Sequence, residues 1–106
     1  METSCDRSLI VVPANRALAW SVQVPVEGRL RVSLSAAAPV IVRVLDGAAY
    51  ERAASGRPCD ALHKTDVARR QSFSMKFQGP ETQYAVEITN CDANEDNAAC
   101  LLLEVA

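Results

Sequence analysis

The feature that most constrains the fold of this chain is an alternation of apolar residues with polar or small ones. The alternation has a period of two and recurs along the 106-residue sequence, in segments that begin at Leu18, Leu30, Val40, Phe73, Tyr84 and Leu101. Successive side chains of a β-strand point to opposite faces, so each segment would have one apolar face and one wetter face. The pattern therefore predicts an all-β protein built from short strands.

We expect eight strands, with turn residues between most of them. The expected ranges are residues 7–12, 17–24, 29–35, 40–45, 59–66, 71–77, 83–90 and 100–105. Pro13, Pro25, Pro39 and Pro80 fall between these ranges, where a residue without an N–H group removes no hydrogen bond from a sheet. Such a series predicts two antiparallel sheets packed as a β-sandwich of jelly-roll or Greek-key topology, with residues 1–106 forming a single domain.

One short helix is expected near residues 47–55. Asp46 can accept hydrogen bonds from the free amides at a helix start, and Gly56 can adopt the left-handed conformation that ends a helix. The residues between them are mostly good helix formers, and there is room for about two turns. We expect Tyr50 and Ala54 to face inward from this helix.

The alternation also predicts the core. Apolar residues make up 49% of the chain, which is enough for a normal hydrophobic interior. The residues expected to point inward are Trp20, Val22, Leu30, Val32, Leu34, Val42, Val44, Phe73, Met75, Phe77, Tyr84, Val86, Ile88, Leu101 and Leu103.

The charge of the chain argues against a nucleic-acid partner. The net charge is −2 and the pI is near 5.3, whereas a nucleic-acid binder usually has a strongly basic surface. Arg29, Arg31 and Arg43 fall on outward phases and would form a small basic strip, joined by Arg69 and Arg70, on a solvated sheet face. The longest apolar run near the N-terminus, residues 9–12, is far too short to span a membrane.

Four cysteines in so short a chain favour disulfides and therefore a secreted or periplasmic location. Cys91 and Cys100 flank a loop between two expected strands, and a hairpin would place them about 4.5–5.5 Å apart at Cα, within the range of a disulfide. Cys5 and Cys59 would then form a second, long-range bridge. The alternatives are four reduced thiols in a cytoplasmic protein, or a zinc site that also uses His63.

The loop at residues 92–97 has the ligand spacing that begins a calcium loop. Asp92, Asn94 and Asp96 supply oxygens at alternate positions, as in the first half of an EF-hand. The match then fails, because Asn97 stands where the EF-hand has glycine and Leu103 where it has a bidentate glutamate. Calcium is thus a candidate ligand, and a solvated turn rich in Asp and Asn is the simpler interpretation.

Patterns typical of enzymes are nearly absent from the sequence. The glycines are isolated, and neither a nucleophile elbow nor a metalloprotease helix occurs. A thiolate–imidazolium pair of Cys59 and His63 is the one nucleophilic arrangement to consider, against a structural cysteine and a loop histidine. We therefore expect no catalytic activity and no cofactor other than the candidate calcium ion.

The order of these segments resembles small bacterial β-sandwich modules of the pre-peptidase C-terminal (PPC) type and, more distantly, GOLD domains. The segments that show the resemblance are Trp20–Val24, Gly28–Leu34, Val40–Asp46, Phe73–Phe77, Gln83–Asn90 and Leu101–Val105. The chain departs from the PPC pattern at Pro39–Val44, which replaces an acidic strand, and at Thr82–Gln83, which replaces a glycine.

The resemblance implies a non-catalytic binding or structural module of an exported or extracytoplasmic protein or assembly. Its partner would be a protein or a carbohydrate. A second hypothesis is a calcium-dependent or carbohydrate-binding, lectin-like domain that uses the acidic loop at residues 92–97.

Overall fold

The chain forms one antiparallel sheet with one short helix. The computed structural model describes residues 4–78, 80 and 82–106, and side chains in the first strand from Arg7 onward. The elements are β1 (Ser4–Val12), β2 (Ala17–Gln23), β3 (Arg29–Asp46), α1 (Gly47–Ala54), β4 (His63–Lys64), β5 (Ala68–Lys76), β6 (Gln83–Asn90) and β7 (Asn97–Val105). The prediction of an all-β protein with one short helix is confirmed.

Strand β3 is the centre of the sheet, and it bends. The sequence predicted two strands, 29–35 and 40–45, where the structure has one strand of 18 residues. Its first part lies between β5 and β7, and its last part lies between β4 and β6. The register of β3 with β5 shifts between Ser35 and Val40, which marks the bend. One bent strand therefore belongs to both halves of the fold.

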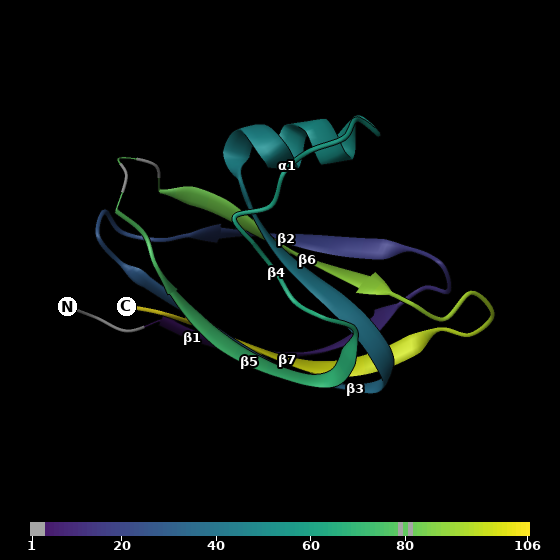
Figure 1. Cartoon of the computed structure of the whole chain (residues 1–106). Helices are drawn as coiled ribbons and strands as arrows, with labels where there is room; N and C mark the ends of the chain where they lie inside the picture. The colour runs from purple at the N-terminus through teal and green to yellow at the C-terminus, as the bar shows by residue number, and fades with distance from the viewer. Residues whose placement is uncertain (1–3, 79, 81) are drawn as a thin grey trace.

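The whole sheet curls over at this bend (Figure 1). We call β1, β7, the first part of β3 and β5 the front half, and β2, β6, the last part of β3 and β4 the back half. The predicted sandwich of eight strands in two sheets is replaced by a single seven-stranded curled sheet. The alternation shows which face of a strand is buried, but it does not show which strands pair.

Strands β6 and β7 do not form a hairpin, contrary to the sequence prediction. Val40 pairs with β5 on one edge and with β6 on the other, and Leu30 pairs with β5 and β7 in the same way. Thus β6 and β7 follow one another along the same edge of β3. The loop at residues 91–96 joins them at the bend.

The concave side of the curled sheet holds the main core, and every residue predicted to point inward contributes to it. Trp20, Phe73, Met75 and Leu103 are partly buried there, and the other predicted residues are buried. Phe77 and Tyr84 stack with their ring centroids 3.9 Å apart. Val12, Val24, Val40 and Ala99 also belong to this core and were not predicted.

The helix covers the outer face of the back half. Asp46 caps it by accepting a hydrogen bond from the Ala49 N–H at 2.7 Å, and Gly56 follows it with a φ of 74°, as the sequence predicted. Ala49 packs on Leu45 and Ala85 in a second, small cluster that also includes Tyr50 and Ala53. Tyr50 is therefore turned inward as expected, but Ala53 takes the place expected for Ala54, which is exposed.

Candidate functional site

The outer face of the front half is not covered by any described part of the chain. We call it the front face. Because the neighbours of its residues along each strand are buried in the core, these side chains must point outward. They are Arg7, Leu9 and Val11 from β1, Ala98, Cys100, Leu102 and Glu104 from β7, Arg29, Arg31, Ser33 and Ser35 from β3, and Arg70, Ser72, Ser74 and Lys76 from β5.

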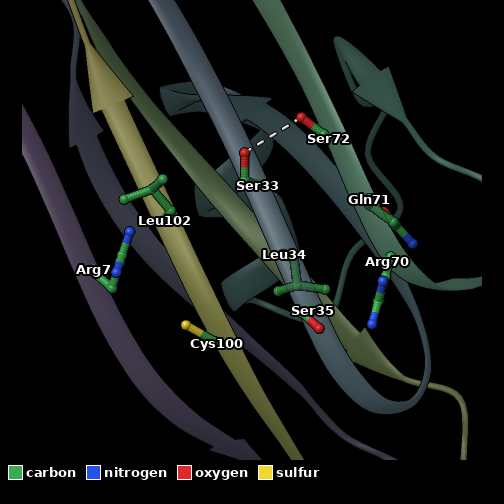
Figure 2. Close-up of a pocket in the computed structure, with 9 residues that line it drawn as sticks. All are labelled: Arg7, Ser33, Leu34, Ser35, Arg70, Gln71, Ser72, Cys100 and Leu102. Carbon is green, nitrogen blue, oxygen red and sulfur yellow. Dashed lines mark hydrogen bonds between the residues drawn. The ribbon is translucent and has the colours of Figure 1, made fainter.

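The middle of the front face is an open groove (Figure 2). Two rows of side chains cross the four strands there. One row is Arg7, Leu102, Ser33 and Ser72, and the other is Leu9, Cys100, Ser35 and Arg70. The serines and Cys100 are short, so they form a low floor, with Leu102 between Ser33 and Arg7. The longer Arg7 and Arg70 stand on either side of the groove. The Oγ atoms of Ser33 and Ser72 lie 3.4 Å apart on this floor.

Beside the groove, strand β1 exposes two large apolar side chains. Leu9 is 88% exposed and Val11 is 57% exposed, and both belong to an edge strand of the sheet. Isolated exposed apolar residues are normal, whereas neighbouring ones on one face of an edge strand make that face a candidate interaction surface. The sequence contained a signal for them: residues 9–12 are all apolar, so both faces of this strand had to be apolar.

The front face is also basic. Arg7, Arg29, Arg31, Arg70 and Lys76 form no ion pair within the described part of the chain. Glu104 is the carboxylate that the register places among them, beside Arg31. The front face thus offers guanidinium groups whose donors are available to another molecule.

The predicted basic strip is divided by the curl of the sheet. Arg29, Arg31 and Arg70 lie on the front face, whereas Arg43 belongs to the back half. The Nε atom of Arg43 donates to Glu87 Oε1 at 2.7 Å, and this hydrogen bond is the main cause of the raised pKa of Arg43. Since Arg43 already has a carboxylate partner, it is not part of the candidate site.

The acidic loop uses its carboxylates to hold the backbone at the bend. Asp92 Oδ1 accepts hydrogen bonds from the N–H groups of Asn94 and Glu95, and Asp96 Oδ1 accepts one from Ala14. Within the described residues, no three His, Cys, Asp or Glu side chains gather as a metal site would require. Binding of calcium by Asp92, Asn94 and Asp96 stays a prediction, which calorimetric titration with calcium tests.

The hairpin on which the predicted Cys91–Cys100 disulfide was based is not formed. Asn90, next to Cys91, pairs with Val40, whereas Cys100 pairs with Ser35, five residues earlier in β3. The two cysteines therefore do not face one another across a pair of strands, as the predicted disulfide required. Cys91 and Cys100 are free thiols, and so is Cys59. We therefore do not propose this disulfide. The side chain of Cys5 lies outside the described residues, but Cys59 is a free thiol, so the predicted Cys5–Cys59 disulfide is not formed in this structure.

We predict that Cys91 and Cys100 each react with a thiol reagent when the protein is purified without reductant. The exposed Cys91 should react first, and the half-buried Cys100 more slowly. Peptide mass mapping after alkylation measures both. A peptide that links Cys91 to Cys100 would contradict this prediction and the strand order on which it is based.

Cys59 and His63 lie on opposite faces of the sheet. Cys59 packs with the cluster beneath α1 and accepts a long contact of 3.8 Å from Arg43. His63 pairs with the buried Val44, and its ring lies 4.4 Å from that of Phe73. The thiolate–imidazolium pair considered from the sequence is therefore not formed.

Comparisons with known proteins support the fold. No protein-family model matches the chain. No curated protein sequence matches it either. A solved structure described as PliG from Aeromonas hydrophila, a periplasmic inhibitor of g-type lysozyme, is similar with a TM-score of 0.74 and 9% identity, covering 96% of this chain and 86% of that one. A subunit of disulfide-linked Bacillus endospore appendages is similar with a TM-score of 0.55 and 17% identity, covering 96% of this chain and 86% of that one.

At these identities the likeness extends to the fold alone. Neither of these two proteins is described as a PPC or GOLD domain, so that resemblance stays a prediction. Among the described residues, no helix is long and apolar enough to cross a membrane.

Proposed function

We propose that this chain is a non-catalytic module that binds a protein partner through its front face. The observation that supports this most strongly is the pair of exposed side chains, Leu9 and Val11, on an edge strand beside an open groove. An exposed apolar strip costs solubility, and burying it against a partner removes that cost. The helix covers the corresponding face of the back half with its own cluster.

The front face suits a protein better than a carbohydrate. Sugar-binding surfaces commonly use an exposed aromatic ring as a platform, because the apolar face of a sugar stacks on it. Here Trp20, Phe73, Phe77 and Tyr84 pack in the core, and Tyr50 packs beneath the helix. None of the side chains described on the front face is aromatic. The lectin-like hypothesis therefore has less support than protein binding.

We further propose that the module works in an exported protein or assembly. PliG is described as a periplasmic inhibitor of g-type lysozyme, so the target of that protein is another protein. The Bacillus endospore appendages are described as disulfide-linked pili. Both are consistent with an extracytoplasmic binding role. Fractionation of the cells that make this protein tests the location.

The binding proposal is tested by quantitative capture with matched surface variants. The wild type, a front-face variant (Leu9→Ser with Val11→Ser) and a control variant (Val26→Ser with Leu62→Ser) are immobilised and exposed to the extracellular and periplasmic fractions of the source cells. Val26 and Leu62 are exposed apolar residues too, at 56% and 49%, but they lie outside the front face. We expect one set of proteins to be retained by the wild type and the control and lost from the front-face variant.

Two results would contradict the proposal. One is that the front-face variant retains the same set of proteins as the wild type, in equal amounts. The other is a defined glycan that binds the wild type on an array, with no protein partner retained. The second result would favour the lectin-like hypothesis, and repeating the array with calcium would show whether the loop at residues 92–97 takes part.

A further inference from the structure

We infer that the groove of the front face recognises an extended, acidic segment of the partner protein. This inference rests on the proposed function and adds the chemistry of the partner. It is based on the positions of Arg7 and Arg70, which stand on opposite sides of a low floor and have no carboxylate partner among the described residues.

The spacing of the two arginines suits one extended chain. Strands β1 and β5 are separated by β7 and β3, so they lie roughly 14 Å apart at the usual strand spacing. An extended segment that packs on a sheet lies about 10 Å above it. A segment over the floor would therefore be within reach of both side chains, which can bend toward it from either side. Ser33, Ser35 and Ser72 supply hydroxyl groups beneath it.

Arg7 and Arg70, on the two sides of the groove, favour carboxylates as binding partners. A guanidinium group has five N–H donors in a planar fork and forms bidentate hydrogen bonds with a carboxylate. Arg29, Arg31 and Lys76 extend the positive charge along the same face toward the end of the sheet, where Glu104 lies beside Arg31. Leu9 and Val11 adjoin the groove on the β1 side, so the segment should also have an apolar residue next to its acidic ones.

The charge of the rest of the chain favours a short segment over a long polyanion. The net charge of the chain is −2, yet the front face has an excess of basic groups, so the remaining surface is acidic. A nucleic acid or a sulfated glycan that extended beyond the groove would be repelled by that surface. A short acidic segment would contact the front face alone.

Titration followed by NMR amide shifts tests this inference on the intact chain. The probes are a short peptide of Asp and Glu residues with one Leu, the same peptide with Lys in place of the acids, and a heparin fragment. We expect the acidic peptide to shift the amides of Arg7, Ser33, Ser35 and Ser72. The variant Arg7→Gln with Arg70→Gln should weaken its binding by at least ~10-fold, because it removes two charge-assisted contacts. A control, Arg52→Gln with Arg57→Gln, changes two exposed arginines near α1 and should leave binding unchanged.

Four results would overturn the inference. They are the absence of binding of the acidic peptide, shifts confined to residues outside the groove, equal affinity of the Arg7→Gln, Arg70→Gln variant, and tighter binding of the heparin fragment than of the acidic peptide. The capture experiment separates this inference from the proposed function. If the Leu9→Ser, Val11→Ser variant loses its protein partner but the arginine variant keeps it, protein binding stands and recognition of acidic residues does not.

Discussion

Substitution Asn90→Asp is expected to lower the free energy of unfolding by roughly 3–5 kcal/mol at pH 7. The buried Asn90 side chain donates from Nδ2 to the carbonyls of Val12 at 3.2 Å, Pro13 at 3.3 Å and Glu95 at 2.9 Å. Its Oδ1 accepts from the Asp92 N–H at 2.9 Å. A carboxylate at this position would turn a negative oxygen toward carbonyl oxygens that need donors.

The loss of unfolding free energy caused by Asn90→Asp should be smaller at pH 4 than at pH 7. Burial and the facing carbonyls disfavour the charged form, so the pKa of the introduced carboxyl group is raised in the folded state above its unfolded value of about 3.9. The folded variant therefore binds more protons than the unfolded one at intermediate pH, and its stability falls as pH rises from about 4 toward the folded pKa. A protonated carboxyl can also donate one hydrogen bond to a carbonyl.

Urea denaturation of the wild type and the variant at both pH values measures this effect. Asn94→Asp is the matched control, because Asn94 is in the same loop, is exposed and makes no side-chain hydrogen bond in the described structure. Its effect should stay within about 0.5 kcal/mol. Equal losses for the two variants, or a loss for Asn90→Asp that does not depend on pH, would show that Asn90 does not support the bend.

Substitution Gly28→Ala is expected to cost roughly 2–3 kcal/mol of stability. An added Cβ would lie 2.7 Å from the Pro25 carbonyl oxygen, 2.9 Å from Val24 Cγ1 and 3.0 Å from the Ala106 carbonyl oxygen. The two carbonyls are held in place, since Gly28 donates to Pro25 at 2.7 Å and Arg29 donates to Ala106 at 2.8 Å. Relief of the clash therefore requires the backbone to move where β2 passes to β3.

Gly56→Ala is the comparison for this substitution. A Cβ at Gly56 would meet nothing within 4 Å, but its φ of 74° is unfavourable for alanine. The cost should be about 1 kcal/mol. Thermal or urea denaturation of both variants gives the difference. If Gly56→Ala lowered the stability more than Gly28→Ala does, the close packing described around Gly28 at the β2–β3 connection would be contradicted.

Local features of the fold were predictable because their causes are local. The apolar positions of Leu30, Val32 and Leu34 alternate, so they had to share the buried face of one strand. Asp46 and Gly56 marked the two ends of the helix through their own backbone preferences. The range predicted for β6, residues 83–90, agrees with the structure at both ends.

The pairing of the strands was not predictable, because alternation contains no information about partners. The loop at residues 91–96 looked like a hairpin turn, yet it continues along the same edge of β3. The bend is held by buried amides: Asn97 donates to the Ala38 carbonyl at 2.7 Å and accepts from the Ala38 N–H at 3.0 Å. These contacts take the place of ladder hydrogen bonds where β3 bends. The alternation of apolar and polar residues gives no sign of them.

The candidate site was predicted only in part. Arg29 and Arg31 were expected to point outward, and they do. Their neighbours on the front face come from β1, β5 and β7, which are far apart in sequence, so the groove exists only after the sheet has formed. Arg43 was grouped with them because the bend that moves it to the back half leaves no trace in the alternation.

Photocrosslinking inside the source cells tests directly whether the front face binds a protein. A benzophenone amino acid replaces Leu9 in one version of the protein and Leu62 in another. Leu9 lies on the front face, and Leu62 is exposed just before β4. We predict discrete protein adducts from position 9 that are absent from position 62. The absence of adducts at position 9, or the same adducts at both positions, would contradict a protein-binding front face.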